Sequence, residues 1–287
     1  MNSFVKSHGL GNDYIVLNSK DIDFNLDINN IKLICDRNYG IGSDGILLLT
    51  SSEKADFGLR ILNPDGSEAE KSGNGLRIFA KYLFEHGHTA KNIFSIDTPG
   101  GLVTAELEVE EDLVHHVTVE MGHASFNSKN IPVTGKEREV VEEELRINGD
   151  ILKFTAVTVG NPHCVVFIDN LNDEYIKKIG PLIENNPIFP NRTNVQLAKV
   201  ISKDEVEILI WERGAGYTLA SGSSSCAVAA ACVRSNLTSN KLKITMPGGE
   251  LDIIIRDDWS IKMRGEVEEV SSGQFSKDFI RRLKTSL

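Results

Sequence analysis

The sequence has no long hydrophobic run. Its most apolar stretches stop well short of the roughly 18 consecutive apolar residues that a membrane-spanning helix needs. The stretch MNSFVKSHGLGNDYIVLNS also lacks the basic region and the apolar core of a secretory signal. We therefore expect a cytoplasmic protein that has no membrane partner.

Cysteine is scarce as well, and the four cysteines show no C-x-x-C or finger-like spacing. They are Cys35, Cys164, Cys226 and Cys232. We expect free thiols in a reducing compartment, with neither a disulfide framework nor a structural zinc. The histidine pairs at 86 and 88 and at 115 and 116 have no carboxylate or cysteine at ligand spacing, so no metal site is expected there.

Basic residues are outnumbered, because 31 Lys and Arg face 41 Asp and Glu and give a formal net charge of -10. A nucleic-acid surface needs clustered Lys and Arg, so we expect no nucleic-acid partner. The composition otherwise matches ordinary globular proteins, with 40% hydrophobic and 25% charged residues. A chain of 287 residues can form one large domain or two smaller ones with a sizeable core.

Motifs for nucleotide binding and for serine hydrolysis are weak or missing. Residues 40–45 satisfy G-x-G-x-x-G, but the β-like run at 46–50 follows where a dinucleotide site needs a helix. No glycine-rich loop ends in Gly-Lys-Ser or Gly-Lys-Thr, and the serines around 221 do not form G-x-S-x-G. The sequence therefore gives no reason to expect a cofactor.

Short β-rich segments recur along the whole chain, separated by turns of Gly, Asn, Asp and Pro. We predict strands at 4–6, 14–18, 45–50, 57–62, 93–98, 101–108, 114–121, 153–159, 163–168, 194–201, 205–211, 242–245, 250–255 and 260–264. Many strands and few helices indicate a mixed α/β protein, of the α+β kind, with largely antiparallel sheets.

Two strongly apolar helices are predicted, at residues 74–85 and at about 223–233. Nearly identical segments precede them, Ser-Gly-Asn-Gly from Ser72 and Ser-Gly-Ser-Ser from Ser221, separated by 221 − 72 = 149 positions. We infer two pseudo-symmetric halves, each a sheet around one central helix, with the helix N-termini facing a shared cleft. The predicted N-terminal half is 1–122, completed by 266–287, and the C-terminal half is 123–265.

A helix N-terminus presents unpaired backbone N–H groups and a partial positive charge, which suits a carboxylate. Two facing N-termini would therefore suit a small anionic molecule. An alternative interpretation is that Ser72 and Ser221 only cap their helices, as serine often does. Two matching copies at half-chain separation favour the first interpretation.

Seven motifs, in this order along the whole chain, resemble the signatures of the diaminopimelate epimerase family. They are HGLGNDY from His8, GIGSDG from Gly40, NPDGSE from Asn63, GNGLR from Gly73, GNPH from Gly160, NV from Asn194 and WERG from Trp211. The resemblance extends to PGGEL at 247–251. It implies an isomerase of lysine and cell-wall biosynthesis that inverts LL-2,6-diaminopimelate to the meso form without pyridoxal phosphate or another cofactor. It also implies a homodimer.

The resemblance further implies roles for individual residues. The family's two catalytic cysteines, an acid/base pair on opposite sides of the substrate α-carbon, correspond to Ser72 and Ser221. His163 and Glu212 would adjust the pKa values of that pair. The residues expected to contact the diamino diacid are Asn12, Asn63, Gly73, Asn74, Asn161, Asn194, Glu212, Arg213, Gly222 and Ser223.

Serine at both catalytic positions departs from the family pattern. A thiol ionises near pH 8.5 and lower at a helix N-terminus, whereas an aliphatic hydroxyl needs a strong neighbouring base. We therefore expect this chain to have little or no epimerase activity. One hypothesis is a cysteine-to-serine double variant that traps substrate. The alternative is a natural divergent member, which is either an isomerase or dehydratase that uses serine or a non-catalytic amino-acid binding protein.

Overall fold

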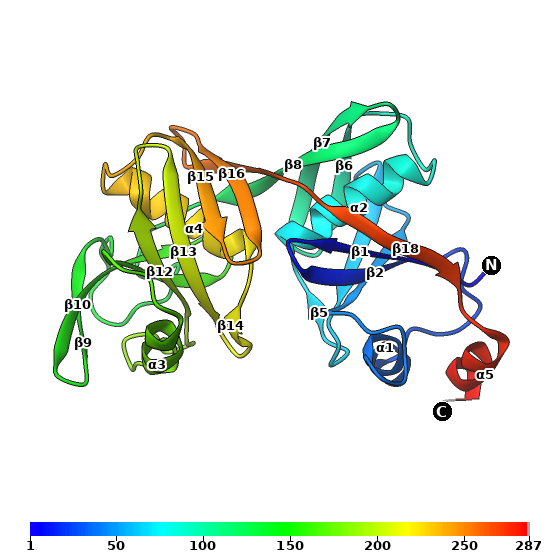
Figure 1. Cartoon of the computed structure of the whole chain (residues 1–287), viewed down its shortest axis with the longest axis horizontal. Helices are drawn as coiled ribbons and strands as arrows, with labels where there is room; N and C mark the ends of the chain where they lie inside the picture. Colours follow the sequence, from blue (N-terminus) through cyan, green and yellow to red (C-terminus); the bar gives the residue numbers. More distant parts are fainter. Residues whose placement is uncertain (286–287) are drawn as a thin grey trace. The chain divides into compact units, whose positions relative to one another are not determined.

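The computed structural model describes residues 1–285 and contains five α-helices and eighteen β-strands in that range (Figure 1). The chain forms two compact units, Met1–Val119 with Gly265–Leu287 and Glu120–Arg264. The sequence prediction placed the divisions at 122/123 and 265/266. The first residues of the predicted C-terminal half, 123–140, contribute Ile131, Val133 and Val140 to the core of the second unit.

Unit 1 contains a sheet and three helices, of which α2 (Gly73–Glu85) is the central one. Its elements are β1 (Ser3–Gly9), β2 (Asn12–Asn18), α1 (Ile28–Cys35), β3 (Ile46–Thr50), β4 (Phe57–Leu62), β5 (Glu68–Ala69), α2 (Gly73–Glu85), β6 (Ile93–Thr98), β7 (Gly101–Glu110), most of β8 (Leu113–His123), β18 (Glu268–Gln274) and α5 (Lys277–Thr285). The neighbours in its sheet follow the order β18, β1, β2, β3, β4, β6, β7, β8.

Unit 2 contains the corresponding elements of the second half. They are β9 (Glu143–Ile147), β10 (Asp150–Thr158), β11 (Pro162–Phe167), α3 (Asp173–Glu184), β12 (Asn194–Val200), β13 (Glu205–Glu212), β14 (Gly216–Thr218), α4 (Gly222–Arg234), β15 (Lys241–Met246), β16 (Gly249–Ile255) and β17 (Ser260–Gly265). The neighbours in its sheet follow the order β9, β10, β11, β12, β13, β15, β16, β17.

The two units repeat one pattern of strand pairing. In unit 1, β1–β2 is antiparallel, β2–β3 parallel, β3–β4 antiparallel, β4–β6 parallel and β6–β7 antiparallel. In unit 2, β10–β11, β11–β12, β12–β13, β13–β15 and β15–β16 follow the same sequence of directions. The expected mixed α/β architecture with two pseudo-symmetric, mostly antiparallel halves is confirmed.

A central helix is largely buried in each unit, as the sequence predicted. In α2 the buried positions run without interruption from Gly73 to Ala80, and in α4 they run from Ser224 to Cys232. Both helices begin one residue earlier than expected. Burial on nearly all sides explains why the α4 sequence is apolar or small at almost every position.

Each unit has its own hydrophobic core. The core of unit 1 includes Ile15, Ile46 and Phe275, so the segment after residue 265 supplies part of it. The core of unit 2 includes Phe154 and Phe189, whose rings meet edge to face with centroids 5.8 Å apart. Three helices were not predicted: α1, α3 and α5. They are amphipathic, and in α3 the buried residues Ile176, Ile179 and Ile183 follow helical spacing, so the sequence carried a signal that the prediction missed.

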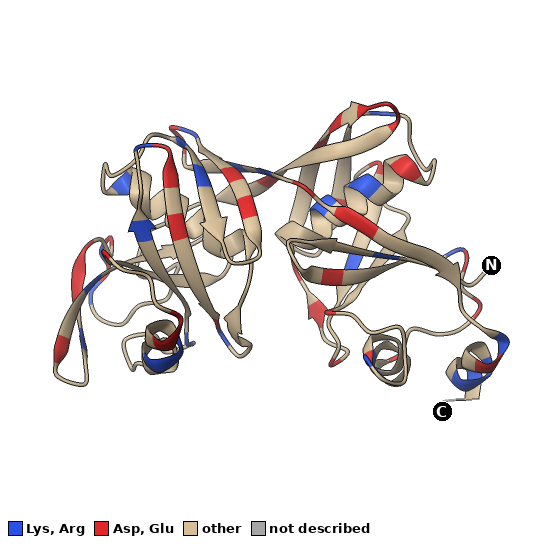
Figure 2. Ribbon diagram, in the orientation of Figure 1, with Lys and Arg blue, Asp and Glu red and all other residues tan. Residues whose placement is uncertain are grey.

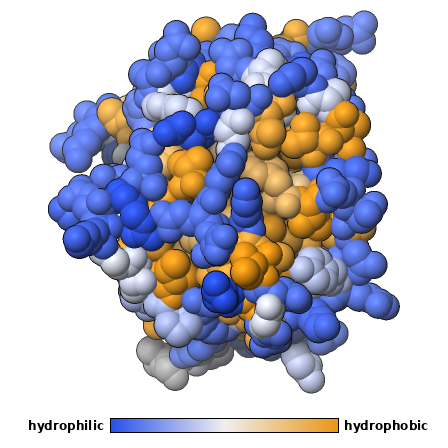
Figure 3. Space-filling view, turned by 90° about the vertical axis from the view of Figure 1, so that its left-hand side faces the viewer, coloured by the Kyte–Doolittle hydropathy of each residue, from blue (hydrophilic) through white to orange (hydrophobic). Residues whose placement is uncertain are grey.

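Charged residues of both signs are interspersed along the strands and helices of both units (Figure 2). The face shown in Figure 3 carries hydrophobic side chains among hydrophilic ones. Within residues 1–285, none of the helices has the length and apolar character needed to cross a bilayer.

Candidate functional site

Ser72 is the N-cap residue of the central helix of unit 1. Its backbone is extended, with φ −138° and ψ 120°, and its Oγ accepts a hydrogen bond from the Gly75 N–H at 3.1 Å. This is the geometry of a standard serine cap, which compensates one of the unpaired N–H groups of the first turn. The Tyr14 hydroxyl lies 3.2 Å from the same Oγ, and the Tyr14 side chain is buried. The serine is thus held between a helix terminus and a phenol.

A chain of amide contacts lies beside this cap. The buried Arg77 guanidinium donates to Asn74 Oδ1 at 2.9 Å, and Asn74 Nδ2 donates to Asn12 Oδ1 at 3.2 Å. Asn12 Nδ2 in turn donates to the Asp44 carboxylate at 2.9 Å. Asn12 and Asn74, both predicted to contact the ligand, are therefore brought together with fixed amide orientations.

Asn63 belongs to a tight turn at the end of β4. Its backbone N–H bonds to the Ser67 carbonyl at 2.8 Å, and its Nδ2 donates to Ser67 Oγ at 2.9 Å. Gly66, with φ +89°, makes the turn possible because a left-handed backbone favours glycine. These contacts of Asn63 are those of a turn residue, and its expected role in ligand binding stays a prediction.

Ser221 occupies the matching position in unit 2. It caps α4 by accepting from the Ser224 N–H at 3.5 Å, and only 6% of it is exposed. Its Oγ donates to Glu212 Oε2 at 3.3 Å, and Ser223 Oγ lies 3.5 Å away. Unlike Ser72, this serine has a carboxylate as its hydrogen-bond acceptor.

His163 contacts neither serine through its ring nitrogens, because both nitrogens are engaged elsewhere in unit 2. Nε2 lies 2.8 Å from Asn161 Oδ1, and Nδ1 lies 3.1 Å from Gln196 Nε2. Asn161 Nδ2 reaches Ser223 Oγ at 3.5 Å. Burial lowers the pKa of His163 to about 3, so the ring is neutral near pH 7. Its contact with Ser221 is therefore indirect, through Asn161 and Ser223.

Asn194 joins two loops of unit 2. Its Nδ2 donates to the Pro162 carbonyl at 2.8 Å, and its Oδ1 accepts from the Arg213 N–H at 2.9 Å. The buried Glu184 holds the same Trp-Glu-Arg-Gly turn by accepting from Trp211 Nε1 at 2.7 Å and from the Gly214 N–H at 2.9 Å. The Arg213 side chain is exposed and donates to the Asn191 carbonyl at 3.1 Å.

The residues around the two helix N-termini correspond at one constant separation. Each pair is 149 positions apart, since 161 − 12, 163 − 14, 212 − 63 and 221 − 72 all equal 149. The pairs are Asn12 with Asn161, Tyr14 with His163, Asn63 with Glu212, and Ser72 with Ser221. Gly11 and Gly160, one residue before the paired asparagines, both have positive φ, +86° and +111°. The polar groups around each helix N-terminus are thus equivalent in backbone position but differ in chemistry.

Sequence reasoning missed three residues that contact the predicted ones or their motifs: Tyr14, Gln196 and Glu184. Tyr14 ends the first motif and Gln196 directly follows the Asn194-Val195 motif, yet each occupies a strand position typical of core residues. The 149-residue offset was the one available signal for Tyr14, because it pairs this residue with His163. Glu184 lies at the end of α3, which was not predicted.

The four cysteines are all buried and unpaired by disulfides. Burial raises the pKa of Cys232 to about 12, and it raises the pKa values of Cys35 and Cys164 as well. A buried thiol of raised pKa is a poor proton acceptor at pH 7. The residues at the helix N-termini are therefore the better candidates for chemistry. Among residues 1–285 no three His, Cys, Asp or Glu side chains gather in a way that could hold a metal.

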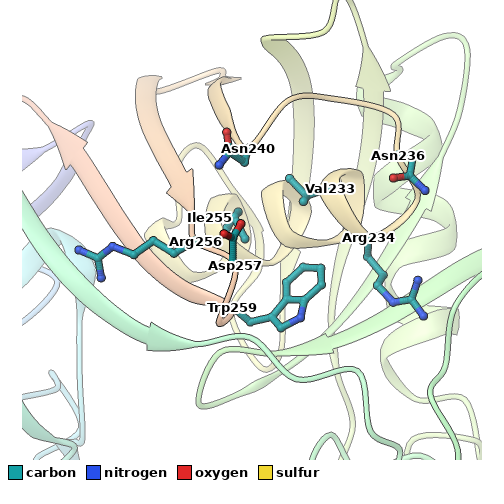
Figure 4. A pocket seen from close by; sticks show the side chains of 8 residues that line it. All are labelled: Val233, Arg234, Asn236, Asn240, Ile255, Arg256, Asp257 and Trp259. Carbon is teal, nitrogen blue, oxygen red and sulfur yellow. The ribbon is translucent and has the colours of Figure 1, made fainter.

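A surface pocket of about 510 Å³ lies at the other end of α4 (Figure 4). In the view of Figure 4, Arg234 and Arg256 extend away from each other, and they pair with Glu139 at 2.6 Å and Glu120 at 3.2 Å. The thirteen residues of α4 place this pocket about 20 Å from Ser221. It is therefore separate from the capped N-terminus. Its lining residues are Val233, Arg234, Asn236, Asn240, Ile255, Arg256, Asp257 and Trp259.

Comparison with known proteins gives a consistent result. The model of the diaminopimelate epimerase family matches residues 4–127 and 155–270. Diaminopimelate epimerase 2 of Nostoc sp. is 51% identical over 276 residues, which is 96% of each chain. Diaminopimelate epimerase of Pelotomaculum thermopropionicum is 40% identical over 95% of this chain and 98% of its own.

Solved structures share the fold at low sequence identity. A hydroxyproline epimerase from Agrobacterium vitis superposes with a TM-score of 0.73 at 14% identity, covering 95% of this chain and 90% of its own. A probable proline racemase from Agrobacterium radiobacter superposes with a TM-score of 0.72 at 14% identity, covering 96% and 93%. At this identity the likeness shows the fold alone.

Proposed function

Because the chain belongs to the diaminopimelate epimerase family, an isomerase family, we propose that it is a scaffold for 2,6-diaminopimelate. The proposed reaction is the cofactor-independent inversion of one α-carbon, from the LL to the meso form, in lysine and cell-wall biosynthesis. The observation that carries the proposal is the matched pair of serine-capped helices, with Ser72 and Ser221 at equivalent positions of the two units. A homodimer and a cytoplasmic location belong to the same proposal.

A carboxylate of the ligand would bind first-turn amides at the N-terminus of a central helix. Those N–H groups have no acceptor within the helix, and the helix dipole favours an anion there. Amides of Gly73, Asn74, Gly222 and Ser223 supply such donors. The remaining polar groups of the diamino diacid would bind Asn12, Asn63, Asn161, Asn194, Glu212 and Arg213. Arg213 suits the distal carboxylate because a guanidinium can bind both carboxylate oxygens.

Loss of the two thiols would remove the acid/base pair while leaving the binding groups in place. A thiol at a helix N-terminus can ionise near neutral pH, whereas the hydroxyls of Ser72 and Ser221 cannot do so without a strong base. We therefore expect ligand binding with very slow inversion or none. A cysteine-to-serine double variant that traps substrate is the interpretation we favour.

One contact favours the alternative of a natural divergent enzyme. Ser221 Oγ donates to Glu212 Oε2 at 3.3 Å, so a carboxylate is in place to take the hydroxyl proton. Such a dyad could serve an isomerase or dehydratase acting on a related amino acid. A non-catalytic amino-acid binding protein would use the same groups without turnover.

Restoring both thiols tests the proposal. We expect the Ser72→Cys/Ser221→Cys protein to exchange the α-proton of LL-diaminopimelate with deuterium from heavy water and to form the meso isomer, measured by NMR and by chiral chromatography. The present chain should bind the ligand in calorimetry but show at least a thousandfold slower exchange, about 4 kcal/mol in the barrier.

Single restorations serve as matched controls, because one thiol can complete only half of a two-base inversion. If the present chain binds diaminopimelate but the double variant does not exchange its α-proton, the result would instead support a non-catalytic amino-acid binding protein. Product formation from a related amino acid by the present chain, abolished by Glu212→Gln, would support the serine-using enzyme. If the double variant neither binds nor exchanges diaminopimelate, the proposal is wrong.

A further inference from the structure

Gln196 is a fully buried polar residue on β12 beside the functional residues of unit 2. Its Nε2 lies 2.9 Å from Ser224 Oγ in the first turn of α4 and 3.1 Å from His163 Nδ1. Its Oε1 is buried without a hydrogen-bond partner. One amide nitrogen therefore joins the central helix to the histidine, and the mechanism proposed above assigns this residue no role.

The orientation of the Gln196 amide decides which ring nitrogen of His163 carries the proton. In the observed orientation both N–H groups have acceptors and one carbonyl oxygen has no partner. In the reversed orientation, the amide oxygen would face both His163 Nδ1 and Ser224 Oγ, and two buried N–H donors would have no acceptor. Unpaired buried donors are rarer and costlier than one under-used carbonyl oxygen, so the observed orientation is favoured. His163 Nδ1 is then an acceptor, and the proton is on Nε2.

The proton on His163 Nε2 fixes the next amide as well. Nε2–H donates to Asn161 Oδ1 at 2.8 Å, which turns the Asn161 NH2 group toward Ser223 at 3.5 Å. A reversed tautomer would need the Asn161 NH2 group for His163 and would turn the carbonyl oxygen outward. An NH2 group attracts a carboxylate, whereas a carbonyl oxygen repels it.

We propose that Gln196 is a positioning residue that holds His163 in the Nε2–H tautomer and so makes Asn161 a hydrogen-bond donor at the mouth of α4. The ligand group it serves is a carboxylate. This inference rests on the proposed function only in taking Asn161 as a ligand contact. The chain of contacts from Gln196 to Asn161 stands on the geometry of unit 2 alone.

Nitrogen NMR of protein labelled with 15N-histidine tests the chain of contacts directly. In the present protein His163 should show a protonated Nε2 and a hydrogen-bonded, unprotonated Nδ1. Gln196→Met keeps the side-chain volume but removes the donor, so the Nδ1 resonance should move toward that of a free lone pair. Gln196→Glu places a carboxylate beside His163 Nδ1 that can accept a hydrogen bond. The Nδ1 resonance should then move in the direction opposite to that in Gln196→Met, toward the position of a protonated nitrogen.

Ligand affinity gives the second measurement. Calorimetry with meso-diaminopimelate should show about tenfold weaker binding by Gln196→Met, the loss expected when one charge-assisted hydrogen bond is no longer oriented. Thr155→Val is the matched control, because Thr155 is a fully buried polar residue of unit 2 whose Oγ1 accepts from the Glu142 N–H. It should change neither the His163 resonances nor the affinity.

Opposite outcomes separate this inference from the proposed function. A proton on Nδ1 in the present protein, or Nδ1 resonances that stay in place in the variants that fold, would overturn the role of Gln196 even if the ligand binds. The expected resonances without any diaminopimelate binding by the present protein would support the chain of contacts and reject the ligand assignment.

Discussion

At the scale of single residues, the two helix caps differ in the group that faces the serine. Ser72 meets the Tyr14 phenol at 3.2 Å, whereas Ser221 meets the Glu212 carboxylate at 3.3 Å. These partners come from positions that are not equivalent, since Tyr14 corresponds to His163 and Glu212 to Asn63. A phenol and a carboxylate also differ greatly in acidity. Any chemistry at the two caps would therefore be unequal, with Ser221 the better proton donor to its neighbour.

Burial of neutral His163 predicts how stability depends on pH. Its pKa is about 3 in the folded protein and near 6.5 when unfolded, so only the unfolded state takes up a proton between these values. The stabilisation is complete above pH 6.5 and decreases as the pH falls toward 3, by about 2 kcal/mol at pH 5. The free energy of unfolding, measured in urea, should therefore fall between pH 7.5 and pH 5 by about 2 kcal/mol more in the present protein than in His163→Gln. Equal losses in the two proteins would contradict the burial of a neutral histidine.

At the scale of secondary structure, α3 anchors the turn that carries Glu212 and Arg213. Glu184 accepts from Trp211 Nε1 and from the Gly214 N–H, and the Trp211 ring packs directly on Gly180. An added Cβ at Gly180 would lie 2.6 Å from Trp211 Cγ, closer than atoms can approach. The helix therefore needs glycine here, although glycine lowers helix stability elsewhere.

Gly180→Ala should consequently destabilise the protein. Alanine would gain up to about 1 kcal/mol in helix propensity, but the clash with Trp211 costs about 1–3 kcal/mol and displaces the turn. We expect a lower urea midpoint and weaker binding of meso-diaminopimelate in calorimetry. Leu182→Ala, at an exposed position of the same helix, is the control and should change little. A Gly180→Ala protein more stable than the present one would show that the ring does not pack as described.

At the scale of the whole molecule, the chain forms two hydrophobic cores, and residues after position 265 complete the core of unit 1. Phe275 packs against Phe4, Phe24 and Phe279 with ring centroids 5.1–5.8 Å apart, and β18 pairs with β1. In the core of unit 2, Phe189 packs against Phe154. Residues more than 250 positions apart thus share a core in unit 1, as the Asn30 contact with the Leu283 carbonyl also shows.

Two matched substitutions test whether the units are independent in stability. Phe275→Ala and Phe189→Ala should each cost about 3–5 kcal/mol. In hydrogen exchange followed by mass spectrometry, Phe275→Ala should speed exchange in β1, β2 and α1 while β10–β12 stay protected. Phe189→Ala should give the reverse pattern. Faster exchange across both units from either substitution would mean that the units unfold together.

The sequence by itself determined the family, through seven motifs in order. It also determined the starts of both central helices to within one residue, because caps and apolar periodicity are local signals. It also identified Ser72 and Ser221 as equivalent positions. Only the tertiary structure decided which side chains meet around the predicted residues. Tyr14 and Ser72, which are in contact, are 58 positions apart in the sequence. The contacting pairs Gln196 with His163 and Trp211 with Glu184 are 33 and 27 positions apart. Such contacts join elements far apart in the sequence and depend on strand register, so they form only when the sheets assemble.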